Sequence, residues 1–355
     1  MPDIRVRYED LADFFSACYV KVGVSSEDAR LIAEILGELE LRGIATHGAI
    51  RVPFYIRRLQ KGGLNPRPNM RLERDYPASA VLYADNAPGQ LAASRGMQIA
   101  MEKARQCGVG FVVVKESDHF GAAASYAMQA MRQDMIGMVW SNGYPTMAAW
   151  GGYGTNITNA PLAFAIPAGE RPGIVLDISM STVSGGKVRL AAKKGQKIPT
   201  DWVVDKQGRP TDNPNDLPNG GALLPMGMHK GYGMAVVAEV LNGILSGGPF
   251  LSGVILWFAN PEKHSNTGHM VVAIDISKFR DLAEFKADVD LLIDRLKATP
   301  TMEGFKEVLI PGEIELRKTA EHVRDGIPIT EQVMKDLRDL ARELGVAVNK
   351  EWTQE

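Results

Sequence analysis

A histidine and an arginine four residues apart, His47 and Arg51, are the first pair of side chains in the sequence whose types and spacing suit chemistry. In a helix, residues i and i+4 lie on one face, so the two side chains would point the same way. Two cationic groups repel, so the pair suits a site that holds an anion. The arginine can bind a carboxylate through two hydrogen bonds, and the histidine can exchange a proton. The alternative is two solvated residues on a surface helix, and spacing alone favours it.

A second candidate is His119, which follows the very apolar run at residues 111–114 and precedes a predicted helix. Functional groups are often carried by the loop between a buried strand and a helix. Asp118 or Glu116 could orient the imidazole and tune its pKa. The alternative, of about equal weight, is that Ser117 or Asp118 caps the helix and that His119 has no chemical role.

Two further segments suit phosphate. Asp177 ends a predicted buried strand, and four hydroxyl side chains, Gly185, Gly186 and Lys187 follow it. Hydroxyls, free backbone N–H groups and a helix N-terminus bind anions, whereas Asp177 could hold a histidine or a ribose hydroxyl. The second segment is His229-Lys230, which lies between glycines at a predicted helix start, and its lysine could contact a phosphate as a point charge. Serine-rich turns are common, so neither segment is specific alone.

Several established kinds of site are missing from the sequence. No Gly-x-Gly-x-x-Gly follows a strand, and there is no Walker A spacing, Gly-x-Ser-x-Gly or His-Glu-x-x-His. The two cysteines form no zinc cluster, and His264 and His269 have no third ligand beside them. We therefore expect no metal site.

The elements that must position these side chains change along the chain. Residues 1–65 are predicted to be mainly helical, with one helix from about 25 to 43 and another over 48–59, where Pro53 predicts a kink or a late start. Predicted strands cover residues 80–83, 111–114, 136–140, 162–166, 174–178 and 269–276. Predicted helices cover 89–106, 122–132, 231–245 and 279–296, and the tail from 313 onward is helical and stops at Gly345. This alternation predicts α/β layers around a parallel or mixed sheet.

Composition limits the remaining classes. The chain has 355 residues, 42 acidic against 40 basic side chains and a net charge of −2, which disfavours a nucleic-acid surface. No apolar run approaches the roughly 18 residues of a membrane helix, and the N-terminus does not resemble a signal peptide. Two cysteines fit a reducing compartment. We therefore expect a cytoplasmic protein of about two domains, without nucleic-acid or membrane partners. The 36 glycines are the one compositional excess, and they cluster at residues 143–154, 185–186 and 227–233.

Taken in order, five segments of the sequence resemble the type 2 malate/L-lactate dehydrogenase family. This family also includes ureidoglycolate, sulfolactate, diketogulonate and piperideine-2-carboxylate enzymes. The resemblance runs nearly end to end and is carried by residues 41–51, 117–121, 176–192, 229–233 and 310–313. The run at residues 158–162 departs from the family pattern by a shift or one added residue.

The resemblance implies a nicotinamide-binding fold unrelated to the Rossmann fold: a central mixed sheet flanked by helices, with a helical domain built from both chain ends. We expect residues 1–75 and 300–355 to form the helical domain and residues 76–299 the cofactor-binding domain. The family further implies a homodimer with the active site near the subunit contact.

By the same resemblance, the catalytic residues are His47, His119 and Asp177, and Arg51 binds the substrate carboxylate. Family members differ over which histidine carries the proton, so both remain candidates. The residues implied to contact the cofactor are Ser141, Asp177, Ile178, Ser179, Met180, Ser181, His229, Lys230, Pro311, Gly312 and Glu313. The cofactor is NAD or NADP, and the loop after Ser181 does not distinguish them.

The predicted function is therefore the NAD(P)-dependent interconversion of a small 2-hydroxy acid and its 2-oxo acid. One alternative is a reductase of cyclic imino acids such as piperideine-2-carboxylate. The other is a cofactor- or ligand-binding protein without catalytic activity.

Overall fold

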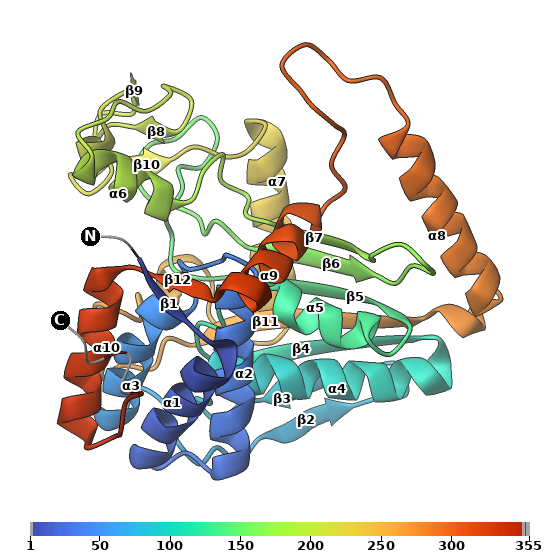
Figure 1. Cartoon of the computed structure of the whole chain (residues 1–355), viewed down its shortest axis with the longest axis horizontal. Helices are drawn as coiled ribbons and strands as arrows, with labels where there is room; N and C mark the ends of the chain where they lie inside the picture. Colours follow the sequence, from blue (N-terminus) through green and yellow to red (C-terminus); the bar gives the residue numbers. More distant parts are fainter. Residues whose placement is uncertain (1–2, 350–351, 353–355) are drawn as a thin grey trace.

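A seven-stranded mixed sheet lies at the centre of the computed structural model, which describes residues 3–349 and 352 (Figure 1). Its order is β2-β3-β4-β11-β5-β6-β7. The strands are β2 (Arg71–Asp75), β3 (Ser79–Tyr83), β4 (Val109–Ser117), β5 (Met135–Ser141), β6 (Leu162–Ile166), β7 (Ile174–Ile178) and β11 (Thr267–Asp275). β3 and β4 pair in parallel, and the other neighbours are antiparallel. The two central strands, β4 and β11, are covered on both faces, which explains their nearly continuous apolar sequence.

Helices α4 (Gly89–Cys107) and α5 (Ala124–Met131) cover one face of the sheet. They lie directly on the backbone of the strands, because a Cβ at Gly110 would sit 1.9 Å from Ala100 O and one at Gly137 would sit 2.2 Å from Ala127 O. The opposite face carries α7 (His229–Ala238) with the π-helix η3 (Glu239–Ile244), α6 (Gly185–Lys193), and a small sheet of β8 (Val203–Val204), β9 (Pro210–Thr211) and β10 (Ala222–Leu223). The sheet is therefore the middle of three layers (Figure 1).

The two ends of the chain come together in a separate apolar core. β1 (Ile4–Val6) pairs antiparallel with β12 (Ile327–Ile329). This core is shared by α1 (Tyr8–Lys21), α2 (Ser26–Leu41), α3 (Val52–Gln60) and α10 (Glu331–Leu344), and α9 (Glu313–Asp325) packs against α2. The expected helices from both chain ends are thus present, and the expected α/β fold with a central mixed sheet is confirmed. The exact domain boundaries, 1–75 with 300–355 and 76–299, stay a prediction.

Most predicted elements are present, with local corrections. The segment before Val52 is not α-helical: residues 46–51 form turns and the 3₁₀ helix η1 (Ala49–Arg51), so the helix predicted over 48–59 starts late, with Pro53 in its first turn. The helix predicted over 231–245 is α7 continued by the π-helix. The last predicted helix of the central region is α8 (Leu282–Lys297), and Gly345 ends α10 as expected. The remaining short helices are η2 (Pro214–Asp216), η4 (Leu251–Gly253) and η5 (Ile276–Lys278).

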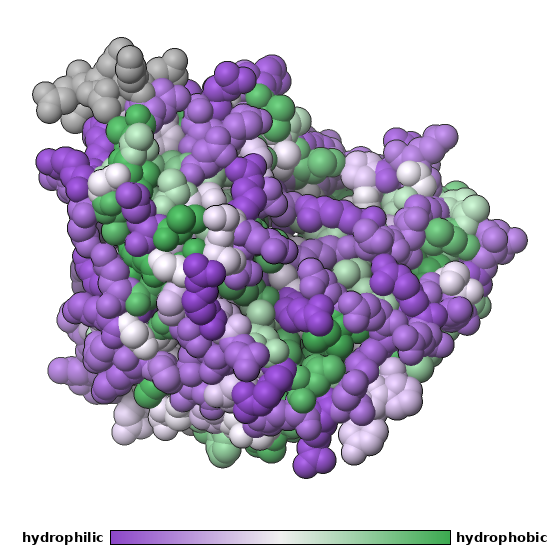
Figure 2. Space-filling view, turned by 90° about the horizontal axis from the view of Figure 1, so that it is seen from below, coloured by the Kyte–Doolittle hydropathy of each residue, from purple (hydrophilic) through white to green (hydrophobic). Residues whose placement is uncertain are grey.

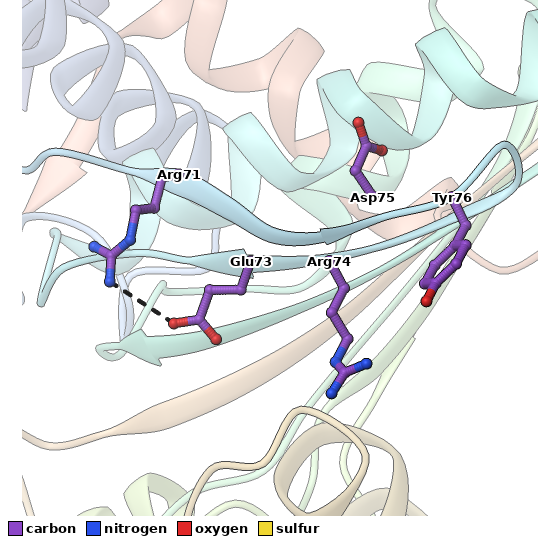
Figure 3. A pocket seen from close by; sticks show the side chains of 5 residues that line it. All are labelled: Arg71, Glu73, Arg74, Asp75 and Tyr76. Atoms are coloured by element: carbon purple, nitrogen blue, oxygen red, sulfur yellow. Dashed lines mark ion pairs between the residues drawn. The ribbon is translucent and has the colours of Figure 1, made fainter.

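The edge strand β2 was not predicted, because all five of its residues are exposed and it lacks an alternating apolar pattern. A shallow surface hollow lies along it, lined by Arg71, Glu73, Arg74, Asp75 and Tyr76 (Figure 3). The two carboxylates there are paired, Glu73 with Lys115 and Asp75 with Lys103. Charged side chains of this kind protect an open sheet edge from pairing with another chain, so we assign the hollow no chemistry.

The molecular surface is mainly polar where it is seen from below, with hydrophobic side chains in small separate patches (Figure 2). In the part of the chain that the structure describes, no helix is both long and apolar enough to cross a membrane.

Candidate active site

The two candidate histidines lie beside each other, although 72 positions separate them in the chain. His47 lies in the turn before η1, and His119 lies in the loop after β4. Their rings are stacked, with centroids 5.6 Å apart and an interplanar angle of 16°. Trp257, from the segment before β11, stacks on His119 at 4.7 Å. The fold thus gathers two imidazoles and an indole in one half-buried cluster.

A buried carboxylate holds the turn that carries His47 and Arg51. Glu40 of α2 accepts a hydrogen bond from Ala49 N at 2.6 Å. A Cβ at Gly48 would lie 2.3 Å from Glu40 Oε1, so this close approach requires glycine. Burial raises the pKa of Glu40 to about 7, and the Ala49 hydrogen bond opposes the shift. The role of these two residues stays a prediction, but the helix predicted to present them is wrong, because a turn pinned by Glu40 carries them.

Tyr55 orients His119. Its hydroxyl lies 2.5 Å from His119 Nδ1. The predicted orienting groups have other contacts: Asp118 is buried in an ion pair with Arg58, and among the described residues no hydrogen bond joins Glu116 to the ring. The capping alternative is also wrong, because α5 begins after Ala123 and neither Ser117 nor Asp118 caps it.

Both imidazoles are neutral at physiological pH. Burial, reinforced by the Arg51 charge, lowers the pKa of His47 to about 4. Burial lowers the pKa of His119 well below its ordinary value, and the nearby His47 and Arg51 add to the effect. A neutral imidazole has one donor and one acceptor nitrogen, so each ring can accept a proton.

Arg51 presents an unused guanidinium fork. Its Nε donates to Thr46 O at 2.8 Å, and its guanidinium carbon lies 5.6 Å from the centroid of the Trp257 ring. In the described chain no carboxylate pairs with it, and its hydrogen bond uses Nε, so its two terminal nitrogens remain available for a ligand carboxylate. Burial lowers the pKa of Arg51, and nearby Arg189 lowers it further, so the site already carries excess positive charge.

Asp177 lies at the end of β7, as predicted, but does not touch the histidines in the described chain. It accepts a hydrogen bond from Ala124 N at 2.8 Å, at the N-terminus of α5. Burial raises the pKa of Asp177 to about 6, and that hydrogen bond opposes the shift. Among the described residues no hydrogen bond reaches its second carboxylate oxygen, Oδ1, so this oxygen can accept a further hydrogen bond.

The residues after Asp177 form a turn rich in hydroxyls. Ile178 and Ser179 are half-buried, and the Ser179 and Ser181 hydroxyls lie 3.0 Å apart. Met180 is buried, and its backbone is hydrogen-bonded to the backbones of Asn159 and Met226. α6 begins four residues after Ser181, and its first turn reaches the histidine loop, since a Cβ at Gly186 would lie 3.5 Å from Thr46 Cγ2. The turn therefore lies close to the histidine cluster.

His229 and Lys230 are exposed in the first turn of α7. Lys230 has no acidic partner among the described residues. An exposed ammonium beside a helix N-terminus is a donor set that suits phosphate, so these residues fit the phosphates of a dinucleotide.

The predicted segment 311–313 borders the same strand as Asp177. Pro311 O accepts a hydrogen bond from Val175 N, and Gly312 has φ +93° with its Cα packed on Val175. Glu313 pairs with Lys297 and Arg317, and the Lys297 hydrogen bond lowers the pKa of Glu313 to about 2. Its carboxylate is already engaged within the chain.

Sequence reasoning missed the role of His269. This histidine is fully buried in β11, where its Nδ1 lies 2.9 Å from Ser141 Oγ and its Nε2 lies 2.8 Å from Ser117 Oγ. It therefore links three adjacent strands. Ser141, a predicted cofactor contact, is buried with its hydroxyl used in this link. The described residues contain no cluster of His, Cys, Asp or Glu suited to a metal ion.

The chain matches the family model described as malate/L-lactate dehydrogenase over residues 6–338. It is 35% identical to a malate dehydrogenase of Pyrococcus horikoshii, covering 97% of this chain and 96% of the relative. The solved structure of that protein aligns with a TM-score of 0.90, at 33% identity over 98% of this chain and 97% of the other.

Two other relatives differ in the substrates they are named for. An L-sulfolactate dehydrogenase of Methanocaldococcus jannaschii is 37% identical over 92% of this chain and 94% of the relative. The structure of a delta1-piperideine-2-carboxylate reductase from Pseudomonas syringae aligns with a TM-score of 0.85, at 27% identity over 95% of this chain and all of the other (100%).

Proposed function

The chain belongs to the malate/L-lactate dehydrogenase family and is an oxidoreductase, and we propose that it interconverts a small 2-hydroxy acid and its 2-oxo acid with NAD or NADP. The observation that carries this proposal is the unpaired guanidinium of Arg51 beside two stacked imidazoles. A cation that binds a carboxylate, next to a group that accepts a proton, is what oxidation of a 2-hydroxy acid requires from the protein.

We propose that His119 is the histidine that exchanges the proton with the substrate, because a side chain of another element fixes the orientation of its ring. With Nδ1 donating to the Tyr55 oxygen, Nε2 accepts the proton of the substrate hydroxyl as the C–H hydrogen leaves C2 as hydride. A bound nicotinamide would supply the acceptor for that hydride. The carboxylate held by Arg51 adds a negative charge that stabilises the imidazolium formed. In the reverse direction the same nitrogen returns the proton to the carbonyl oxygen.

His47 and Asp177 keep supporting roles in this proposal. His47 stacks on His119 and lies in the same turn segment as Arg51, so it helps to form the part of the site proposed to bind the substrate. Asp177 has a free carboxylate oxygen at the strand end and would accept a hydrogen bond from the cofactor. The cofactor side comprises Ser141, residues 177–181, His229, Lys230 and residues 311–313, and the exposed Lys230 at the start of α7 supports this assignment most directly.

The proposal is tested by two measurements on the purified full-length protein. Titration with NADH and with NADPH, followed by fluorescence, should show saturable binding of at least one and so identify the coenzyme. Turnover with pyruvate, oxaloacetate and piperideine-2-carboxylate should favour a 2-oxo acid. Binding without turnover on any 2-oxo acid or imine would leave a non-catalytic binding protein as the function.

A reductase of cyclic imino acids is the second candidate, supported by the structural neighbour named for piperideine-2-carboxylate. The same Arg51 would hold its carboxylate. A ratio of kcat/KM that favours the imine over both 2-oxo acids would establish this alternative in place of the first.

We propose that the protein is a homodimer with the site near the subunit contact. The helix that begins at His229 carries exposed apolar side chains along α7 and the π-helix: Met234, Val237, Val240, Ile244 and Leu245. A second copy of the chain would cover them beside the cofactor residues. Light scattering after chromatography should give twice the monomer mass, and Val237→Glu with Ile244→Glu should give the monomer.

We propose the reducing cytoplasm as the compartment, because both cysteines are free. Cys18 is buried and Cys107 is exposed. Fractionation of the producing cells would test this.

A further inference from the structure

The segment between η4 and β11 places one aromatic side chain, Trp257, against the residues proposed to act on the substrate. Trp257 is 8% exposed and stacks on His119 and on Tyr55, with ring centroids 4.7 and 5.3 Å away. Arg51 lies over the same ring. One indole therefore contacts the proposed proton carrier, the tyrosine that orients it and the proposed carboxylate ligand. None of the roles assigned above uses it.

A single buried arginine holds this segment in place. Arg58 of α3 is fully buried, and its terminal nitrogens lie 2.9 Å from the carbonyl oxygens of Trp257, Asn260 and Lys263. The side chain thus contacts both ends of a loop of seven residues. The loop contains no helix or strand, so these bonds fix its shape together with local ones, from Ala259 N and Asn260 Nδ2 to Leu256 O and from Lys263 N to Asn260 O.

The same guanidinium is bonded to the loop that carries His119. Arg58 donates to Asp118 Oδ2 at 2.5 Å, and Asp118 Oδ1 accepts from the backbone N–H of His119. The carbonyl oxygen of Gly63, three residues after α3, also accepts from Arg58, and a Cβ at Gly63 would lie 2.2 Å from Pro261 O. Three segments that are distant in sequence are therefore fixed to one cation, which sets the spacing between the indole and the imidazole.

We propose that Trp257 is a positioning residue of the active site, which holds the His119 imidazole and the Arg51 guanidinium at their working places, and that Arg58 fixes the segment that carries it. The proposal rests on the roles given above to His119 and Arg51. Trp257 touches the proton carrier but exchanges no proton itself.

Two consequences separate this role from simple packing. The indole excludes water from one side of His119, so its removal should raise the pKa of His119 toward the ordinary value of about 6.5. The indole also supports the Arg51 guanidinium, so removal of the indole should raise KM for the carboxylate substrate. Loss of alignment of about 1 Å at a reacting group costs roughly 100-fold in rate.

Other charged and titratable groups face His119, and none of them is substituted in the two Trp257 variants. They are His47 and Arg51 from the turn and η1, Tyr55 and Arg58 from α3, Asp118 from its own loop and His269 from β11. The comparison of the Trp257 variants with the wild type therefore changes the indole alone.

The test compares Trp257→Ala, Trp257→Phe and Arg58→Lys with Trp202→Phe, a half-buried tryptophan beside β8 that serves as the matched control. We expect Trp257→Ala to lose about 10–100-fold in kcat/KM, Trp257→Phe only a few fold, and the control less than about twofold. Arg58→Lys keeps a cation beside Asp118 but cannot reach the three carbonyls, so it should resemble Trp257→Ala. If Arg58→Lys does not fold, the Trp257 pair still decides.

The second readout is the titration of His119 by NMR without substrate, assigned with His119→Gln. In Trp257→Ala the pKa should rise, and in Trp257→Phe it should change little. Equal losses of activity in both Trp257 variants with an unchanged His119 titration would show a merely structural role and overturn the proposal. Wild-type protein that turns over no 2-oxo acid or imine, while the His119 titration still depends on Trp257, would reject the proposed function and leave the positioning role standing.

Discussion

The side chains proposed to meet the substrate contact one another closely, whereas those proposed to meet the cofactor are more open. His119 has Tyr55 on one nitrogen and rings stacked against it, and the turn of Arg51 is pinned by Glu40. Lys230, by contrast, is exposed, and within the described chain no acidic side chain pairs with it. The substrate side is therefore preorganised by packing, while the cofactor side depends on groups that a bound ligand would order.

This difference reflects what each side must do. Proton transfer needs a geometry fixed to within a fraction of an ångström, which aromatic stacking and short hydrogen bonds supply. Phosphate binding relies on charge and on backbone N–H groups, which tolerate small displacements. Substitutions should therefore cost much more on the substrate side.

The largest effect is expected at His119. His119→Gln should reduce kcat by roughly 10²–10⁴-fold, the usual contribution of a general acid or base. His47→Gln should reduce kcat less than about tenfold, because we propose that the proton passes through the His119 ring, which Tyr55 orients. Steady-state kinetics on both variants checks the assignment, and the reverse order would give the proton to His47.

A smaller loss is expected at the carboxylate ligand. Arg51→Gln should raise KM for the 2-oxo acid by about 10–100-fold, since a hydrogen bond to a charged group contributes roughly 1.5–3 kcal/mol. The KM for the coenzyme should stay within about twofold. A rise in both constants would mean that Arg51 serves the cofactor side as well, and the contrast between the two sides would weaken.

The sequence was informative where function coincides with local pattern. Three local patterns located residues that the fold places in one region. They are the spacing of His47 and Arg51, the position of His119 after an apolar strand, and the position of Asp177 at a strand end. The α/β layering followed from the alternation of strand and helix patterns. The prediction that a helix presents His47 and Arg51 was wrong because Glu40, an ordinary residue within a helical pattern, imposes a turn from a distance.

Other parts of the site leave no local signal. Tyr55 is 64 positions from His119, and Arg58 is 199 positions from Trp257, so their contacts exist only after the chain has folded. From a single sequence, an aromatic residue on a helix or in a loop is interpreted as part of the hydrophobic core. His269 was considered only as a metal ligand, although its partners, Ser117 and Ser141, become neighbours only through strand pairing.

Glu40 offers a test of the packed side through stability. Its pKa is about 7 in the folded chain against an ordinary 4.5, so the folded state binds more protons between these values and stability falls as pH rises through them. Glu40→Gln, which keeps an acceptor for Ala49 N, should remove this loss, up to about 3 kcal/mol at 1.4 kcal/mol per pKa unit. Denaturant unfolding at pH 5 and pH 8 measures it. Parallel pH profiles in wild type and variant would contradict the buried, proton-binding role.

The smallest effect is expected on the open side, at Lys230. Lys230→Met removes an exposed charge at the start of α7, so it should raise KM for the coenzyme about fivefold, equivalent to roughly 1 kcal/mol, and leave kcat nearly unchanged. Because exposed charges are screened, the difference between wild type and variant should shrink as salt rises from 0.05 to about 0.5 M. Lys206→Met, on the exposed turn between β8 and β9, is the matched control. A large loss of kcat in Lys230→Met would mean that the cofactor side is as tightly organised as the substrate side, because only a group aligned with the reacting atoms changes the chemical step without changing binding.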